Sequence, residues 1–196
     1  MAHWVGTDER PREDGSVVTL SVADVLAMEA PVQALAREDR AVVAQAAMET
    51  WGLCGVGVRR GDSWAGVILV APEGGVPRGH PVSVSGIDCS TAALILVYIE
   101  STSSPIVLGK KLCVGLCRRL RGQITGIEAQ AGLVSTTLTP STEWLTLMGF
   151  HPLRYPARRY RLHFSSLAAW VQDHLLRYRH PLNLSAQPTP ASRTVN

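Results

Sequence analysis

Residues 103–114, SSPIVLGKKLCV, have the composition of an anion-binding turn. They follow an apolar run, and the basic amphipathic segment 109–121 is predicted to be a helix. The first N–H groups of a helix lack intrahelical partners, and the helix dipole adds about half a positive charge there. Gly109 has no Cβ, so a phosphate could approach its main chain, and Lys110 and Lys111 would attract it. The segment therefore predicts a phosphate site. The alternative is a plain strand-to-helix connection before a solvated basic helix.

Two other kinds of chemistry find no support in these residue spacings. A Walker A loop would need Ser or Thr where Lys111 stands, and Gly where Ser104 stands. The four cysteines include no CxxC and no Cys/His pairing at zinc spacing. Cys113 and Cys117 share one face of the predicted helix and are expected to be packed thiols. We predict no metal site.

The elements that must position this turn alternate between strand and helix patterns. The predicted order is strand 16–22, a helical region 24–50 broken near Pro31, hairpin 54–72, strand 92–101, helix 109–121, strand 123–132, helix 141–148, strand 158–164 and helix 165–179. This order predicts an α/β (α+β) sheet covered by helices.

Length and composition are those of one folded domain. The chain has 196 residues, of which 46% are hydrophobic and 18% charged. We expect a flexible leader over 1–15, a single domain over 16–180 and a disordered tail over 181–196. No apolar run reaches the ~18 residues of a membrane span, and no signal-peptide segment is seen, so a cytoplasmic protein without membrane contact is expected. A net charge of +3 argues against a nucleic-acid partner.

The order of elements resembles that of the GNAT superfamily of acyl-CoA-dependent N-acyltransferases. The family's signature, a strand, then Arg/Gln-x-x-Gly-x-Gly/Ala, then a helix, falls on residues 104–109, where Gly109 alone matches. Downstream, GIEAQAG is similar to the family's fifth strand, STEWLTLMGFHPLRY to the following helix with its Gly-Phe, and RRYRLHF to its last strands. The resemblance covers about residues 17–165.

The resemblance implies a mixed, twisted sheet of six to seven strands flanked by helices. The strands at about 92–101 and 124–130 would splay apart to admit the pantetheine arm of acetyl-CoA, which would pair with main-chain groups of residues 97–101. The co-substrate-binding residues implied are Val97, Tyr98, Ile99, Ser101, Ser104, Ile106, Val107, Leu108, Gly109, Lys110 and Lys111.

The same resemblance implies transfer of an acetyl or other acyl group to a primary amine by direct attack. Glu128 matches a fifth-strand Glu that serves as base in some members, and Glu100 closes the apolar strand near the expected thioester. The usual Tyr acid is replaced by Leu145, which leaves Tyr98 among the alternative proton donors.

The acceptor is then an amine-bearing small molecule or peptide, and the last predicted helix is either core or a homodimer contact. The alternative function is a non-catalytic module of the same fold that binds acyl-CoA or a protein partner.

Overall fold

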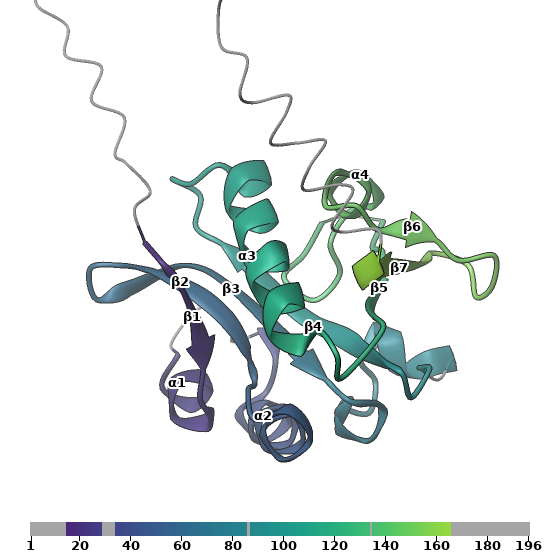
Figure 1. The fold of residues 1–196 in the computed structure, drawn as a ribbon, viewed down its shortest axis with the longest axis horizontal. Coiled ribbons are helices and arrows are strands. Elements are labelled where there is room, and N and C mark those ends of the chain that lie inside the picture. Colours follow the sequence, from purple (N-terminus) through teal and green to yellow (C-terminus); the bar gives the residue numbers. More distant parts are fainter. Residues whose placement is uncertain (1–14, 29–33, 86, 134, 166–196) are drawn as a thin grey trace, which may run out of the picture.

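The computed structural model describes residues 15–28, 34–85, 87–133 and 135–165. Within them, seven strands form one sheet in the order β1-β2-β3-β4-β5-β7-β6 (Figure 1). Only β4 and β5 pair in parallel, and the other neighbours are antiparallel. The strands are β1 (Val17–Leu20), β2 (Gly55–Arg60), β3 (Ser63–Ala71), β4 (Thr91–Ile99), β5 (Gly126–Gln130), β6 (His151–Pro152) and β7 (Arg159–His163).

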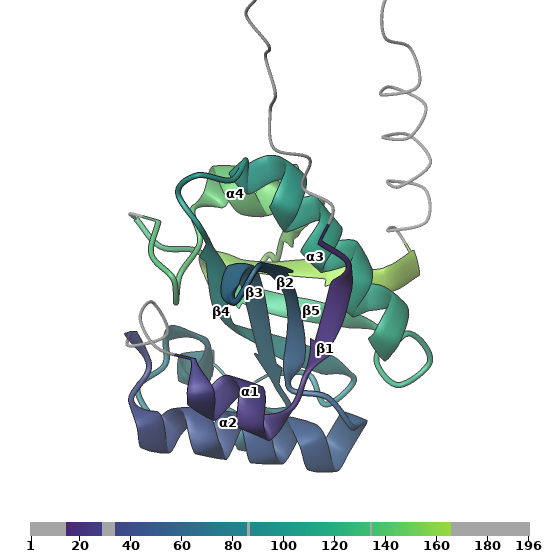
Figure 2. The ribbon, with the colours of Figure 1, turned by 90° about the vertical axis from the view of Figure 1, so that its left-hand side faces the viewer.

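Helices cover both faces of this sheet. The α-helices are α1 (Val22–Ala27), α2 (Arg37–Trp51), α3 (Pro105–Leu120) and α4 (Thr142–Leu147), and a 3-10 helix, η3, spans Pro81–Ser85. Helices α1 and α2 lie on one face, and α3 and α4 on the other (Figures 1 and 2). The predicted mixed sheet flanked by helices is confirmed. No helix in the described part of the chain is long and apolar enough to cross a membrane.

Two apolar cores, one on each face, explain why β3 and β4 are almost continuously apolar. On the α3/α4 side, residues such as Leu94, Leu112 and Leu116 pack together, and on the α1/α2 side Val25, Val43 and residues of β3 and β4 do so. A strand buried on both faces has no polar alternation to show. The strands β3 and β4 therefore form the buried centre of the sheet.

A β-bulge interrupts β4 at its middle. Two consecutive residues of β3, Leu69 and Val70, lie opposite Leu96 and Leu94 of β4. Ile95, between them, therefore has no opposing residue. Both Ile95 and Leu96 belong to the α1/α2-side core. Because one extra residue inverts the alternation that follows, Val97 faces the α3/α4 side.

The helix predicted over 109–121 begins four residues earlier than expected. Ser104 is its N-cap, and its Oγ accepts from the N–H of Val107 at 3.4 Å. Pro105 fits the first helical position because its missing N–H would be unpaired there anyway. Gly109 thus lies inside the helix. A Cβ there would come within 2.9 Å of both Met148 Sδ and Trp144 Cζ2, so this glycine serves the close packing of α3 on α4.

Other predicted elements are found with small changes in length. The helical region 24–50 is two helices, α1 and α2, on either side of the undescribed residues 29–33. Ser141 is the N-cap of α4, and its Oγ accepts from the N–H of Trp144 at 3.1 Å. The tail, nearly all of the leader and all but the first residue of the last predicted helix lie outside the described residues.

Candidate functional site

A cavity of about 420 Å³ opens beside the C-terminal half of β4. Its size falls within the range of about 300–1,000 Å³ that is usual for small-molecule sites. It is lined by Val97, Tyr98, Ile99, Pro105, Ser135, Thr136, Thr137, Pro140 and Trp144. The walls therefore come from β4, the first residue of α3, the segment before α4, and α4 itself.

The cavity exists because β4 and β5 stop pairing partway along β4. They pair only from Thr91 opposite Gly126 to Ala93 opposite Glu128. Beyond Ala93, no strand of the described residues lies along that edge of β4. Val97 packs on the α3/α4-side core and Tyr98 on the α1/α2-side core, so the lining includes residues from both faces of the sheet.

The chain's own segment 135–139 lies against the open edge of β4. The N–H of Val97 donates to the carbonyl of Thr137 at 2.7 Å. The segment is closed on itself, because Thr136 N–H donates to Thr139 O at 3.0 Å and Thr139 N–H donates to Thr136 Oγ1 at 3.0 Å. Main-chain groups alternate along a strand, so the N–H of Ile99 points to the same edge as that of Val97. A bound molecule that paired with the N–H of Val97 would have to displace the Thr137 carbonyl.

The N-terminus of α3 forms one end of the cavity. Trp144 Nε1–H donates to the carbonyl of Pro105 at 3.3 Å and joins α4 to this first turn. Ile106 and Val107 are exposed, whereas Leu108 and Gly109 are buried. The expected close approach of a phosphate to Gly109 is thus not available, because α4 covers that position. Any anion would meet the first turn, residues 104–107.

The remaining predicted residues of this segment do not line the cavity. Ser101 is exposed in the turn after β4, and Lys110 and Lys111 are half-buried in the second turn of α3. Partial burial lowers the pKa of the Lys110 ammonium group. The two lysines follow the capped turn by about one helical turn, so they add positive charge near the cavity without lining it.

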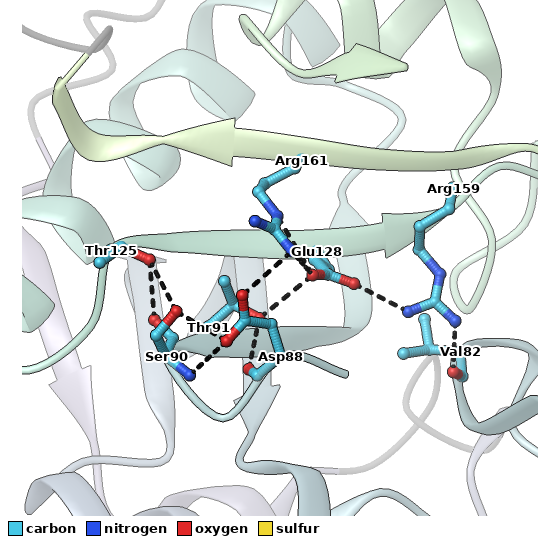
Figure 3. A network of polar contacts seen from close by, with 8 residues as sticks. All are labelled: Val82, Asp88, Ser90, Thr91, Thr125, Glu128, Arg159 and Arg161. Carbon is cyan, nitrogen blue, oxygen red and sulfur yellow. Dashed lines mark hydrogen bonds and ion pairs between the residues drawn. The ribbon is translucent and has the colours of Figure 1, made fainter. Parts of the chain in front are cut away.

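Glu128 is buried in a network of ion pairs on the α1/α2 face (Figure 3). Its Oε2 accepts from Arg159 at 2.9 Å, and its Oε1 accepts from both Nε and a terminal nitrogen of Arg161. Thr91 Oγ1 donates to Oε1 at 3.3 Å, and Arg161 also lies 3.5 Å from Asp88. Glu128 points away from its neighbours Ile127 and Ala129, which pack in the α3/α4-side core, and it is only 3% exposed.

These contacts separate Glu128 from the cavity. It lies opposite Ala93, four residues before the first cavity residue of β4, which is about 13 Å along a strand. Both carboxylate oxygens already accept hydrogen bonds from guanidinium groups. A substrate amine would have to displace one of these arginines to reach it.

Glu100 follows directly after the last cavity residue of β4. Its side chain is about one-third exposed and accepts from Arg60 at 2.8 Å. Arg60 also donates to Thr102 Oγ1 at 2.8 Å and to Ser103 Oγ at 2.9 Å, so the guanidinium group organises the turn between β4 and α3. Glu100 is the nearer of the two predicted bases to the cavity.

Tyr98 contributes a phenol to the cavity lining. Burial, and then the charge of Glu100, raise the pKa of this phenol above its usual value. It therefore keeps its proton at neutral pH, and it can donate a hydrogen bond to a carbonyl oxygen. No group of three or more metal-ligating side chains meets in the described residues.

Sequence reasoning missed two features of this region. Thr137 belongs to no recognisable motif, and its contact with Val97 forms only because the segment before α4 folds back against β4. His80 lies in a Gly/Pro-rich stretch, and nothing in the sequence indicated that its Nε2 reaches the carbonyl of Ile95 at 2.9 Å. Trp144 also forms a wall of the cavity.

Comparison with solved structures finds similarity to GNAT acetyltransferases over about three quarters of the chain. One is Ard1 from Thermoplasma volcanium, with a TM-score of 0.43 and 12% identity, covering 75% of this chain and 94% of that one. Another is a Desulfovibrio desulfuricans protein assigned to the GNAT family of acetyltransferases, with a TM-score of 0.41 and 16% identity, covering 73% and 88%. No protein-family model matches the sequence. A search of curated protein sequences also finds no match.

Proposed function

We propose that the cavity binds the thioester arm of an acyl-CoA and that the protein transfers the acyl group to a primary amine. The observation that carries this proposal is the position of the cavity. It lies where β4 leaves β5, and its lining includes residues from both faces of the sheet. A thioester and an amine can therefore approach from different sides and meet at the strand edge.

The arm is proposed to lie along the open edge of β4. Its amide groups would pair with the main chain of Val97 and Ile99 in place of the Thr137 carbonyl, in the way an added strand pairs with a sheet edge. The phosphate groups would lie at the exposed first turn of α3, near residues 104–107, with Lys110 and Lys111 close by. Gly109 has no part in phosphate binding in this proposal, because it is covered by α4.

The reaction is a direct acyl transfer. The amine nitrogen attacks the thioester carbonyl, the C–N bond forms, and the C–S bond breaks with its electron pair on sulfur. Tyr98 donates a hydrogen bond to the carbonyl oxygen, where negative charge develops. The amine proton passes to a base, and the thiolate takes up a proton to leave as free CoA. Bringing the two reactants together in one cavity supplies much of the rate.

The base remains a prediction for both glutamates. Glu100 is the better candidate, because it is next to cavity-lining Ile99 and its side chain is open to solvent. For Glu128 we propose a structural role, since its oxygens are bound by two buried or half-buried arginines. A Glu100→Gln variant that keeps full turnover would remove Glu100 from the mechanism.

A second function, binding of acyl-CoA without transfer, is favoured by one observation. Among the described residues that line the cavity, Tyr98 alone has a side chain with a titratable group. Leu145, at the position of the family's usual Tyr acid, is fully buried. A binding module would retain the cavity and the open edge of β4 without needing a base.

The test is calorimetric titration with acetyl-CoA, followed by turnover with a panel of amines. Ile99→Trp, which fills the cavity, is expected to abolish binding, whereas Val42→Trp, at an exposed position on α2 that does not line the cavity, should leave binding normal. Free CoA should be measured by chromatography, because exposed Cys89 would react with thiol reagents. Binding without turnover on any amine supports the module. No binding of wild type at millimolar acetyl-CoA contradicts both functions.

A further inference from the structure

The β4 bulge decides which side chains line the cavity. Without the extra residue at Ile95, the two-residue period of the strand would turn Val97 to the α1/α2 side and Tyr98 to the other. The cavity lining depends on Val97 facing the α3/α4 side and Tyr98 facing the α1/α2 side. Whatever fixes the bulge therefore also fixes the site.

Such a bulge can leave the carbonyl of its extra residue without a hydrogen-bond partner, which destabilises it. Ile95 has no partner in β3, and a buried carbonyl without a hydrogen bond is unfavourable because it has lost its contact with water. Here His80 supplies the partner, with Nε2 at 2.9 Å from Ile95 O. The other ring nitrogen, Nδ1, accepts from the N–H of Val82 at 3.2 Å. An Nδ1 that accepts is unprotonated, so the neutral ring carries its proton on Nε2 and donates it to Ile95.

The imidazole is itself held in place. His80 is 4% exposed, and its carbonyl accepts from both the N–H and the Oγ of Ser83, at 2.8 and 2.7 Å. Arg159 donates to Val82 O at 2.7 Å and to Glu128 Oε2 at 2.9 Å, which ties η3 to β5 and β7 (Figure 3). A continuous buried series of polar contacts thus connects Glu128 to the bulge.

We propose that His80 is a positioning residue for acyl transfer: it fixes the β4 bulge through Ile95 and thereby places Val97 and Tyr98 in the cavity. Arg159 and Glu128 act on the same bulge by anchoring Val82. This inference rests on the proposed function, because it concerns the site that binds the thioester arm.

Three variants separate this role from a general effect on folding. His80→Gln keeps both a donor and an acceptor and can span the distance from Val82 to Ile95. His80→Asn keeps an acceptor for Val82 but is too short to reach Ile95. His163→Leu, on the half-buried end of β7, is the control for loss of an imidazole elsewhere.

The first readout is acetyl-CoA affinity by calorimetry on the full chain. His80→Asn is expected to weaken binding about tenfold or more, while His80→Gln and His163→Leu stay within about threefold of wild type. The second readout needs no ligand and is amide hydrogen exchange across residues 94–99. His80→Asn should exchange faster there and His80→Gln should not.

The outcomes are distinct. Normal affinity and normal exchange in a folded His80→Asn protein would overturn the role of His80 while leaving the proposed function intact. Faster exchange with normal affinity would also overturn it, since the bulge would then not govern the site. If wild type binds no acetyl-CoA, the proposed function fails and this inference fails with it, while the exchange result still shows whether His80 holds the bulge.

Discussion

Removing the Glu128 carboxylate should cost far more stability than removing the Glu100 carboxylate. Glu128 and Arg159 have side-chain exposures of 4% and 0%, so Glu128→Ala removes the carboxylate from a buried ion pair. Loss of one partner of a buried ion pair costs about 3–5 kcal/mol. The Glu100–Arg60 pair is 30% and 38% exposed, and exposed pairs contribute about 0–1 kcal/mol. The two substitutions remove the same group from the same residue type.

The difference should be large compared with total stability. Domains are stable by about 5–15 kcal/mol, so Glu128→Ala removes a large part of this. At about 2–4 °C per kcal/mol for a chain of this length, Tm should fall by about 6–20 °C, against less than about 4 °C for Glu100→Ala. Urea unfolding followed by tryptophan fluorescence measures the two differences in unfolding free energy, and thermal unfolding followed by circular dichroism measures the two changes in Tm.

Two further results bear on the reasoning. In a Glu128→Leu/Arg159→Met double variant both buried charges are replaced by apolar groups, and at least half of the lost stability should return. The ion-pair account is refuted if Glu128→Ala costs no more than Glu100→Ala, or if the double variant is less stable than Glu128→Ala alone.

Three other predictions concern the thiols, Gly109 and His80. Exposed Cys89 should alkylate in the folded protein, while the buried thiols react only on unfolding, since burial raises the pKa of Cys54 to about 11 and of Cys113 to about 12; a second fast-reacting thiol would contradict this. Gly109→Ala should lose up to about 2 kcal/mol, because contact with Trp144 and Met148 outweighs the helix propensity of about 1 kcal/mol, and an increase in Tm would speak against tight α3–α4 packing. Burial lowers the pKa of His80, and the charge of Arg159 lowers it further. The hydrogen bond between His80 and Ile95 and the charge of Asp39 oppose this shift but do not cancel it. The unfolded imidazole therefore binds a proton below about pH 6.5 while the folded one stays neutral, so stability should fall as pH drops from about 7.5 to about 5.5, and His80→Gln should lose that part of the fall.

Much of the fold could be predicted because it follows local patterns. The apolar runs of β3 and β4, the turn between β2 and β3, and the buried face of α3 around Leu112 and Cys113 are visible in the sequence. The start of α3 was misplaced at Gly109 because a glycine after a loop resembles a helix start. Ser104 and Pro105 carried the better signal, an N-cap followed by a proline at the first helical position.

The site was harder to predict because it depends on contacts distant in the chain. The resemblance singled out Glu128, but its partners Arg159 and Arg161 come from β7, and only the sheet order brings these residues together. The contact of His80 with Ile95 depends on a β-bulge that no residue type in β4 predicts. The open edge of β4 exists because β5 stops pairing after Ala93, which is a property of the assembled sheet.

The most direct test of acyl-CoA binding at the β4 edge is amide hydrogen exchange with and without millimolar acetyl-CoA. Bound thioester should slow exchange in the segments that contain Val97–Ile99 and Pro105–Val107, and the amides of β1 and β2 should be unaffected. Unchanged exchange at β4 and α3, or protection only in other parts of the chain, would contradict the assignment of this cavity to acyl-CoA.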